Sequence, residues 1–278
     1  MSPEEVAKPR IVSVVKLPHQ RLRSCATKLR SLHRPPPLSP APASPVTVVC
    51  ISDTHGTQPL LPEGDLLIHA GDLTQWGTFR ELQAQLTWLA KQPHKYKVVI
   101  AGNHDLLLDP DFQRYHPERW HQALDSASAS REDRPKVADD LDWGNIVYLQ
   151  NTSTSLTLGN DGRTINIFGS PLTPQYGLSA FQYLGGNDVW SGFIPLNTDI
   201  LLTHGPPWGH LDNRGIKKSG CSSLAKEVAR VRPQLVVFGH IHVGYGQEEW
   251  VMTESEGRMK RSSEPGEGGR TGLIWQCP

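Results

Sequence analysis

The sequence predicts an α/β fold that carries a polar site at the carboxyl ends of its strands. Apolar runs of strand length alternate with segments of helical spacing, and several runs end in a fragment that contains Asp, Asn or His. Continuous apolar strands separated by helices indicate strands that are covered on both faces. Open α/β sheets bind ligands beyond the carboxyl ends of their strands, so these fragments form the candidate site.

The first half of this pattern begins at Val46. Three predicted strands, VTVVCIS, DLLIHA and KVVIA, end in Asp53-Thr54-His55, Gly71-Asp72 and Gly102-Asn103-His104-Asp105. Between the second and third strands, FRELQAQLTWLAKQ has helical spacing, with Leu82, Leu86 and Leu89 on one face. Residues 106–142 form an insertion in which FQRYHPERWHQAL predicts one short helix before a polar stretch, SASASREDRPKVADD.

The second half of the pattern contains a predicted hairpin and two further strands that end in histidines. NIVYL is a predicted strand, and TSTSLTL and TINIFGS form the hairpin around the turn GNDG. TDILLT and PQLVVFG lead into Thr203-His204-Gly205 and Gly239-His240-Ile241-His242, with the helix CSSLAKEVARV between them.

Composition divides the chain into three regions. Residues 1–45 are basic and rich in Pro near HRPPPLSPAPASP, and they predict a disordered tail. Residues 46–246 predict one folded domain. Residues 247–278 are polar and Gly-rich, so they predict a mostly disordered segment with LIWQCP as a candidate last strand.

Charge and cysteine usage restrict the class of protein. The 28 basic and 28 acidic residues balance, which gives no electrostatic case for a nucleic-acid or membrane surface. No run approaches the roughly 18 apolar residues of a membrane span, so we expect a soluble protein. The four cysteines form no CxxC pair or dense framework, which favours a cytoplasmic location. The stretch from Val6 to Ser52 lacks acidic residues, which makes mitochondrial import an alternative that Glu4, Glu5 and Pro18 oppose.

Seven side chains in the fragments are typical metal ligands. Carboxylate, amide oxygen and imidazole together suit Mn, Fe, Zn or Mg rather than softer metals. Two ions that share a phosphate site need about three or four protein ligands each and a group that bridges them. Asp72 is the natural bridge, because each carboxylate oxygen can face one ion. The sequence therefore predicts two divalent or trivalent ions bound by Asp53, His55, Asp72, Asn103, His204, His240 and His242.

His104 and Asp105 are the candidate catalytic residues. His104 follows the predicted ligand Asn103, so we expect it near the metals without binding them, as a general acid or a phosphate contact. Asp105 is expected to orient the His104 ring.

The order Asp-x-His, Gly-Asp, Gly-Asn-His-Asp, His and Gly-His-x-His resembles the calcineurin-like metallophosphoesterase superfamily. Four further segments are similar to the metallophosphoesterase-domain subgroup of this superfamily: LLIHAGDLTQWG, FGSPLTPQYG, ILLTHGPPWGHLD and Gly220-Cys221. This subgroup is allied to class III cyclic-nucleotide phosphodiesterases. The resemblance implies a β-sandwich of two mixed sheets flanked by helices, with residues 46–246 as the catalytic domain and a dinuclear site at the strand ends.

The resemblance also implies a role for each site residue. His104 would serve the leaving group. The first ion would be held by Asp53, His55, Asp72 and His242, and the second by Asp72, Asn103, His204 and His240.

These observations predict a metal-dependent hydrolase of phosphate esters. A hydroxide that bridges the two ions would attack phosphorus, and His104 would protonate the leaving oxygen. The subgroup resemblance favours a phosphodiesterase that acts on a small phosphate ester such as a cyclic nucleotide. A phosphomonoesterase and a non-catalytic scaffold of the same fold are the alternatives. A scaffold would be expected to lack part of the site, and here all seven ligands and His104 are present.

Overall fold

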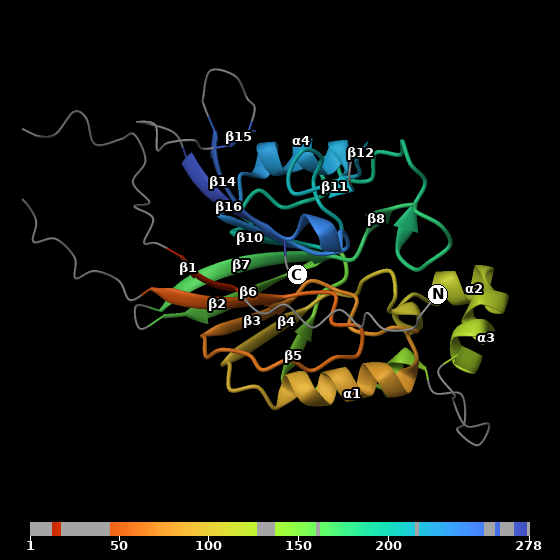
Figure 1. Ribbon diagram of the computed structural model, residues 1–278. Helices are drawn as coiled ribbons and strands as arrows, with labels where there is room; N and C mark the ends of the chain where they lie inside the picture. The colour runs from red at the N-terminus through yellow and green to blue at the C-terminus, as the bar shows by residue number, and fades with distance from the viewer. Residues whose placement is uncertain are drawn as a thin grey trace, which may run out of the picture.

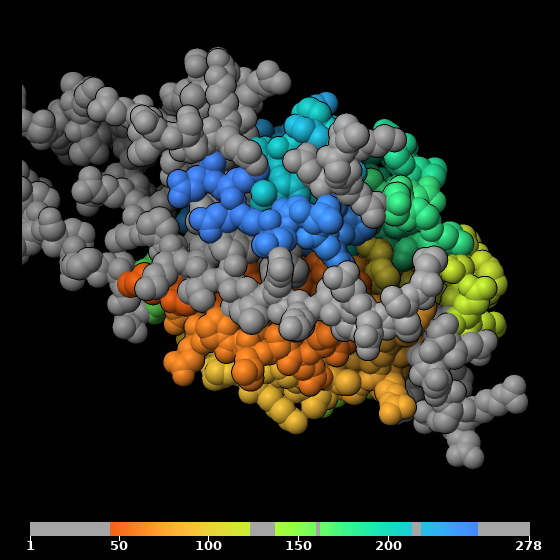
Figure 2. All heavy atoms as spheres, in the orientation of Figure 1, coloured from red at the N-terminus to blue at the C-terminus, as the bar shows by residue number. Residues whose placement is uncertain are grey.

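Two β-sheets pack face to face, and helices cover their outer faces (Figure 1). The structure is a computed structural model that describes residues 13–17, 45–126, 137–159, 162–214, 217–252, 259–261 and 270–276. In the space-filling view, the orange segment that begins near position 46 lies in the lower part of the molecule, and the blue segment around position 240 lies in the upper part (Figure 2). The predicted α/β sandwich of two mixed sheets is confirmed.

The smaller sheet has the order β1-β2-β3-β4-β5 among the described residues. Strands β2 to β5 are parallel, and β1 pairs antiparallel with β2. The bounds are β1 Ser13–Leu17, β2 Val46–Ile51, β3 Leu66–His69, β4 Tyr96–Val99 and β5 Ile146–Tyr148. Because β2, β3 and β4 are parallel neighbours, the polar fragments that follow them meet at one edge.

The larger sheet has the order β15-β14-β16-β13-β10-β7-β6 within the described ranges. Strands β7, β10, β13 and β16 are parallel, whereas β6, β14 and β15 pair antiparallel with their neighbours. The bounds are β6 Thr152–Leu158, β7 Arg163–Ser170, β10 Ile200–Thr203, β13 Leu235–Phe238, β14 Gly246–Met252, β15 Met259–Arg261 and β16 Arg270–Gln276. The β6–β7 pair is the predicted hairpin.

Short strands and 3-10 turns lie in the connections. The short strands are β8 Thr173–Pro174, β9 Gln182–Tyr183, β11 Asn213–Arg214 and β12 Lys217–Lys218. The 3-10 turns are Leu106–Leu108, Ala138–Asp140 and His242–Gly244.

Alternation along the strands separates the inner core from the outer layers. In β2, Val48 and Cys50 join the core between the sheets, whereas Val49 and Ile51 pack in the layer of helix α1. Successive side chains of a strand point to opposite faces, so a strand buried on both faces reads as a continuous apolar run. This is why the predicted strands lacked an apolar–polar alternation.

Helices α1 and α4 cover opposite sides of the sandwich (Figure 1). The helix bounds are α1 Phe79–Ala90, α2 Pro110–Tyr115, α3 Pro117–Ser126 and α4 Ser222–Val231. Helix α1 begins with a capping box in which Thr78 and Glu81 bond each other's main chain. Its buried leucines, Leu82, Leu86 and Leu89, each contribute about 1.5–3 kcal/mol by leaving water.

The terminal regions differ from the prediction. The tail predicted for residues 1–45 contains strand β1, and the segment 247–278 supplies β14, β15 and β16 instead of one last strand. Strand β16 even lies inside the larger sheet, between β13 and β14. These strands join the sheets through main-chain hydrogen bonds, which composition does not record. Residues 1–12 and 18–44, which make up most of the proposed transit segment, lie outside the described residues.

The insertion also differs from the prediction in one respect. Instead of one helix it forms α2 and α3, because Pro117 lacks an N–H and starts a second helix after His116. Residues 127–136 of the insertion lie outside the described residues. Among the helices of the described part, none is long and apolar enough to cross a membrane.

Candidate metal centre

All seven predicted ligands come together at one edge of the sandwich. Asp53 and His55 follow β2, Asp72 follows β3, and Asn103 follows β4. The larger sheet adds His204 after β10, and His240 and His242 after β13. Both sheets therefore supply donors, and the predicted convergence at strand ends is observed. The binding of ions by these residues stays a prediction.

The donors form three overlapping groups, in each of which one atom per residue lies within 4.8 Å of the others. Asp72 belongs to two of the groups. Its Oδ2 lies 3.3 Å from His204 Nε2 and 3.9 Å from His55 Nε2, while Oδ1 accepts a hydrogen bond of 2.8 Å from His104 N. One oxygen of Asp72 thus faces donors on both sides. The three groups are Asp53, His55 and His242; His55, Asp72 and His104; and Asp72, His204 and His240.

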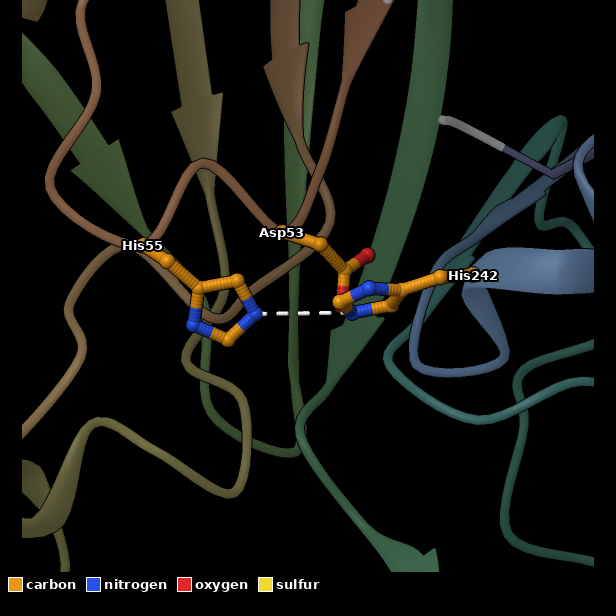
Figure 3. A group of neighbouring side chains, drawn as sticks. All are labelled: Asp53, His55 and His242. Atoms are coloured by element: carbon orange, nitrogen blue, oxygen red, sulfur yellow. Dashed lines mark hydrogen bonds and ion pairs between the residues drawn. The ribbon is translucent and has the colours of Figure 1, made fainter. Parts of the chain in front are cut away.

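The group at one end consists of Asp53, His55 and His242 (Figure 3). His242 Nε2 lies 3.2 Å from Asp53 Oδ1 and 3.4 Å from His55 Nε2. Two ligands held about 2.1 Å from one tetrahedral ion lie roughly 3–3.5 Å from each other, so this spacing fits an ion. The His242 side chain is 58% exposed, which leaves this end of the site open to solvent.

The group at the other end is more deeply buried. The His204 side chain is fully buried, and its Nε2 lies 3.2 Å from Asn103 Oδ1. The His204 and His240 rings lie 5.1 Å apart, and the main-chain N–H of His240 donates to both oxygens of Asp53 at 3.1 Å. This contact joins the two ends of the site through Asp53.

Three histidine rings are oriented by main-chain carbonyls. The Nδ1 atoms of His55, His104 and His204 lie 3.2, 2.9 and 2.8 Å from the carbonyl oxygens of Thr74, Gln75 and Ala70. A carbonyl only accepts, so each Nδ1 carries the proton and each neutral ring keeps its Nε2 lone pair. Metal-binding histidines are commonly held in this way by an acceptor on the second ring nitrogen. The donor set therefore fits bound metal ions.

Four of the seven donors have a backbone that L-residues rarely adopt. The φ angles of Asp53, His55, Asp72 and His240 are 52°, 43°, 54° and 70°. Non-glycine residues in this region cost about 1–3 kcal/mol each and gather at functional sites. The strain is concentrated on the residues that the sequence pattern selects as ligands.

Opposite charges in the site change the pKa values of Asp72 and His204. Burial disfavours the charged Asp72 carboxylate, but the charge and hydrogen bond of His204 outweigh burial and hold the pKa of Asp72 well below its usual range. Burial also disfavours the charged form of the His204 ring. The charge of Asp72 and its hydrogen bond outweigh this effect of burial and raise the pKa of His204 to about 9. The metal-free pair is therefore ionic at neutral pH.

Metal binding is expected to release a proton from His204 at neutral pH, because an imidazole must be neutral to bind an ion. The pKa of His204 is about 9 when folded and 6.5 in the unfolded chain. The charged ring therefore stabilises the metal-free fold fully below pH 6.5, and this contribution is lost as the pH rises through 9. Metal affinity should rise over the same interval. Calorimetric titration with Mn²⁺ in buffers of different ionisation enthalpy measures the number of protons that are released on metal binding. If no proton is released at neutral pH, the expectation is wrong.

Asp105 does not orient the His104 ring directly, which corrects the prediction. Its carboxylate accepts hydrogen bonds from main-chain N–H groups of Leu73, Thr74 and Gly102, and from the Thr74 hydroxyl. The His104 ring instead contacts the Gln75 carbonyl and lies edge-on to His55, with the ring centres 4.8 Å apart. Burial and the nearby charge of Asp72 raise the pKa of Asp105 to about 6. His104 lies beside the donors, as expected.

Three glycines let the main chain approach the donors closely. A Cβ at Gly71 would lie 2.7 Å from His204 Nδ1, and one at Gly239 would overlap Ser52 Oγ and Asp53 Oδ2. A Cβ at Gly102 would overlap the main-chain N and Oδ1 of Asp72. Each glycine directly precedes a predicted ligand, so the Gly-Asp, Gly-Asn and Gly-His pairs have a steric cause.

Gly102→Ala is expected to weaken metal binding by about tenfold or more, because the methyl group displaces the Asp72 carboxylate. Gly185→Ala is the matched control, since a Cβ there meets nothing within 4 Å. The test compares the Mn²⁺ affinities of the two variants by calorimetry. The thermal unfolding temperatures of the metal-free proteins show whether each variant is folded. Equal affinities would show that Asp72 tolerates the methyl group.

The sequence pattern placed His69 beneath the site, but it did not identify the main-chain groups that support the donors. The orienting carbonyls of Ala70, Thr74 and Gln75 are main-chain groups, so no residue type signals them. His69 is a further support, since its Nδ1 accepts from Gly71 N at 3.2 Å and its Nε2 lies 3.0 Å from Thr54 Oγ1. Burial lowers the pKa of His69 to about 3, which keeps this ring neutral.

The fold and the site define a class of protein: a two-sheet α/β sandwich whose strand ends gather carboxylate, amide and imidazole donors. The model of the calcineurin-like phosphoesterase family matches residues 46–244, and the chain belongs to this family. The predicted superfamily and subgroup are confirmed.

Relatives of the chain carry different names. This chain is 38% identical over 216 residues to metallophosphoesterase domain-containing protein 1 of Homo sapiens. The aligned region covers 75% of this chain and 64% of that protein. A UPF0046 protein of Caenorhabditis elegans is 34% identical over 213 residues, covering 72% of this chain and 70% of that protein. A probable rhamnogalacturonate lyase C of Emericella nidulans is 46% identical over 205 residues. That match covers 73% of this chain but 18% of the Emericella protein, so its name describes a much longer chain.

Proposed function

We propose that this protein is a metal-dependent hydrolase of phosphate esters that prefers phosphodiesters. The observation that carries the proposal is the convergence of seven nitrogen and oxygen donors around Asp72, with the His104 ring beside them. Membership of the calcineurin-like phosphoesterase family supports the reaction class. A small phosphodiester such as a cyclic nucleotide is proposed as the substrate, because sequence segments such as LLIHAGDLTQWG resemble the subgroup allied to class III cyclic-nucleotide phosphodiesterases.

The donors would divide between two ions that share Asp72. One ion would be held by Asp53, His55, Asp72 and His242, and the other by Asp72, Asn103, His204 and His240. The spacing of Asp72 Oδ2 from both His55 and His204 supports this division. When bound, ions of the Mn, Fe, Zn or Mg type would neutralise phosphoryl oxygens and lower the pKa of a water molecule.

His104 supplies the proton that the leaving group needs. The Gln75 carbonyl holds a proton on Nδ1, so Nε2 is the ring atom that can give or take a second proton. In the hydrolysis, the oxygen of water bonds to phosphorus, the P–O ester bond breaks, and the leaving oxygen takes the proton from His104 Nε2. The water releases one proton as it attacks, and an equivalent proton returns to His104 Nε2 after the products leave. Such general acid catalysis typically contributes about 10²–10⁴-fold to the rate.

A comparison of two chromogenic esters tests the proposal. Purified protein with Mn²⁺ is expected to hydrolyse bis-p-nitrophenyl phosphate with a higher kcat/KM than p-nitrophenyl phosphate. The reverse order would identify a phosphomonoesterase. Turnover of neither ester with Mn²⁺, Fe²⁺, Zn²⁺ or Mg²⁺ would favour the non-catalytic scaffold.

A further inference from the structure

Asp105 links the chain segment after β3 to the segment after β4. The residue is fully buried, and both of its carboxylate oxygens accept hydrogen bonds. Oδ1 accepts from Thr74 N at 3.0 Å and from Thr74 Oγ1 at 2.7 Å. Oδ2 accepts from Leu73 N at 3.2 Å and from Gly102 N at 2.8 Å. The main-chain position of residues 73 and 74 therefore depends on Asp105.

The segment that Asp105 holds supplies two of the carbonyls that orient histidine rings. Thr74 O accepts from His55 Nδ1, and Gln75 O accepts from His104 Nδ1. The third orienting carbonyl, that of Ala70, has a different support. Ala70 N donates to Ile51 O at 2.8 Å, so the sheet itself fixes the carbonyl that holds His204.

We propose that Asp105 is a positioning residue that sets the tautomer and orientation of the His55 and His104 rings through the carbonyls of Thr74 and Gln75. The effect on turnover rests on the proposed function, whereas the effect on the rings and on metal binding does not. Asp105 does not orient the His204 ring, because the carbonyl that accepts from His204 is that of Ala70, which directly follows β3.

The arrangement requires a carboxylate at position 105. All four contacts bring a donor to Asp105, so a side-chain amide would place its own NH₂ group against two of these donors. Asp105→Asn keeps the size of the side chain and removes this match. We expect the 73–75 segment to shift and its carbonyls to lose their alignment with the His55 and His104 rings.

The variants for the test differ in what they disturb. Asp105→Asn removes the carboxylate, and Thr74→Val removes one of its donors with little change in shape. Asp199→Asn is the matched control. Its carboxylate also accepts from a main-chain N–H, that of Asn166 at 2.8 Å, and from Gln234 Nε2 at 3.1 Å, but it lies before β10, at the opposite end of that strand from His204.

Ring nitrogen NMR of the metal-free proteins at alkaline pH is the first readout. Wild-type protein should show His55 and His104 with the proton on Nδ1. Asp105→Asn should show a mixture of tautomers for both rings, and Thr74→Val a smaller change in the same direction. Asp199→Asn should give the wild-type pattern even where its unfolding temperature falls.

Calorimetric Mn²⁺ titration is the second readout. Asp105→Asn should weaken one of the two binding events by about 10–100-fold, as is usual for groups that orient metal ligands. The other event, which involves His204, should weaken less, because the carbonyl that orients His204 is held by the sheet. With a phosphodiester that has an alkyl leaving group, kcat should fall while KM changes little, because His104 acts on the leaving group.

The outcomes separate this proposal from the proposed function. Wild-type ring patterns and metal affinities in both Asp105→Asn and Thr74→Val would overturn the positioning role. If Asp105→Asn does not fold, Thr74→Val decides alone by the same two readouts. If the wild-type protein hydrolyses no ester, the proposed function fails, but the ring and metal measurements still decide the role of Asp105.

Discussion

Asp72→Asn is expected to abolish hydrolysis and to reduce metal content at both ends of the site. The amide oxygen can take the place of Oδ1 and still accept from His104 N. The amide nitrogen then occupies the place of Oδ2, which faces both His55 and His204. An NH₂ group has no lone pair to offer a metal ion, so the shared donor is lost from both ions at once.

The expected fall in activity is more than about a hundredfold, since even groups that only orient metal ligands cost about 10–100-fold. Metal content by elemental analysis after dialysis should fall from two ions per chain towards none. Asp65→Asn is the matched control, because Asp65 precedes the same strand β3 and accepts from Thr47 N at 2.7 Å away from the donors. Retention of both ions in Asp72→Asn would show that Asp72 is not the bridge.

The positions of the donors were predictable because sequence and topology agree at the strand ends. Strands such as β2 and β13 are almost entirely apolar, so their ends are visible where Asp53 or His240 first appears. Parallel pairing brings the carboxyl ends of β2, β3 and β4 to one edge. The order of the donor fragments then identified the family, and with it the second sheet.

The role of Asp105 was not predictable, because its partners are main-chain groups. The contacts of its carboxylate with Leu73 and Thr74 join positions about thirty residues apart, and any residue type would offer the same N–H. Adjacency to His104 suggested a direct contact between the two side chains. The φ of −87° and ψ of 58° at Asp105 turn the chain, and the carboxylate points to the preceding loop instead.

The terminal strands escaped prediction for a related reason. Strand β14, GQEEWVM, carries two glutamates and resembles a polar loop in composition, yet it pairs with β16 over seven positions. Main-chain pairing tolerates polar side chains, and it depends on a neighbour that is distant in sequence. Strand β1 likewise becomes a strand only because β2 offers an edge.

His104→Ala is expected to lower turnover by about 10²–10⁴-fold while the metal content stays near wild type. The His104 contact with Asp72 uses the main-chain N–H, which alanine keeps. The truncation therefore removes the proton donor and leaves the Asp72 carboxylate in place. His116→Ala provides a matched histidine removal at the end of α2, and it should leave turnover and metal content unchanged.

The leaving group distinguishes a proton donor from a phosphate contact at His104. p-Nitrophenolate leaves without protonation, whereas an alkoxide needs a proton as the P–O bond breaks. Loss of a general acid should therefore slow a diester with an alkyl leaving group much more than bis-p-nitrophenyl phosphate. An equal loss on both substrates would make His104 a contact of the phosphoryl oxygens. A loss of metal ions together with activity would instead place the His104 ring among the ligands. The His104 ring lies close enough to His55 and Asp72 to share an ion with them.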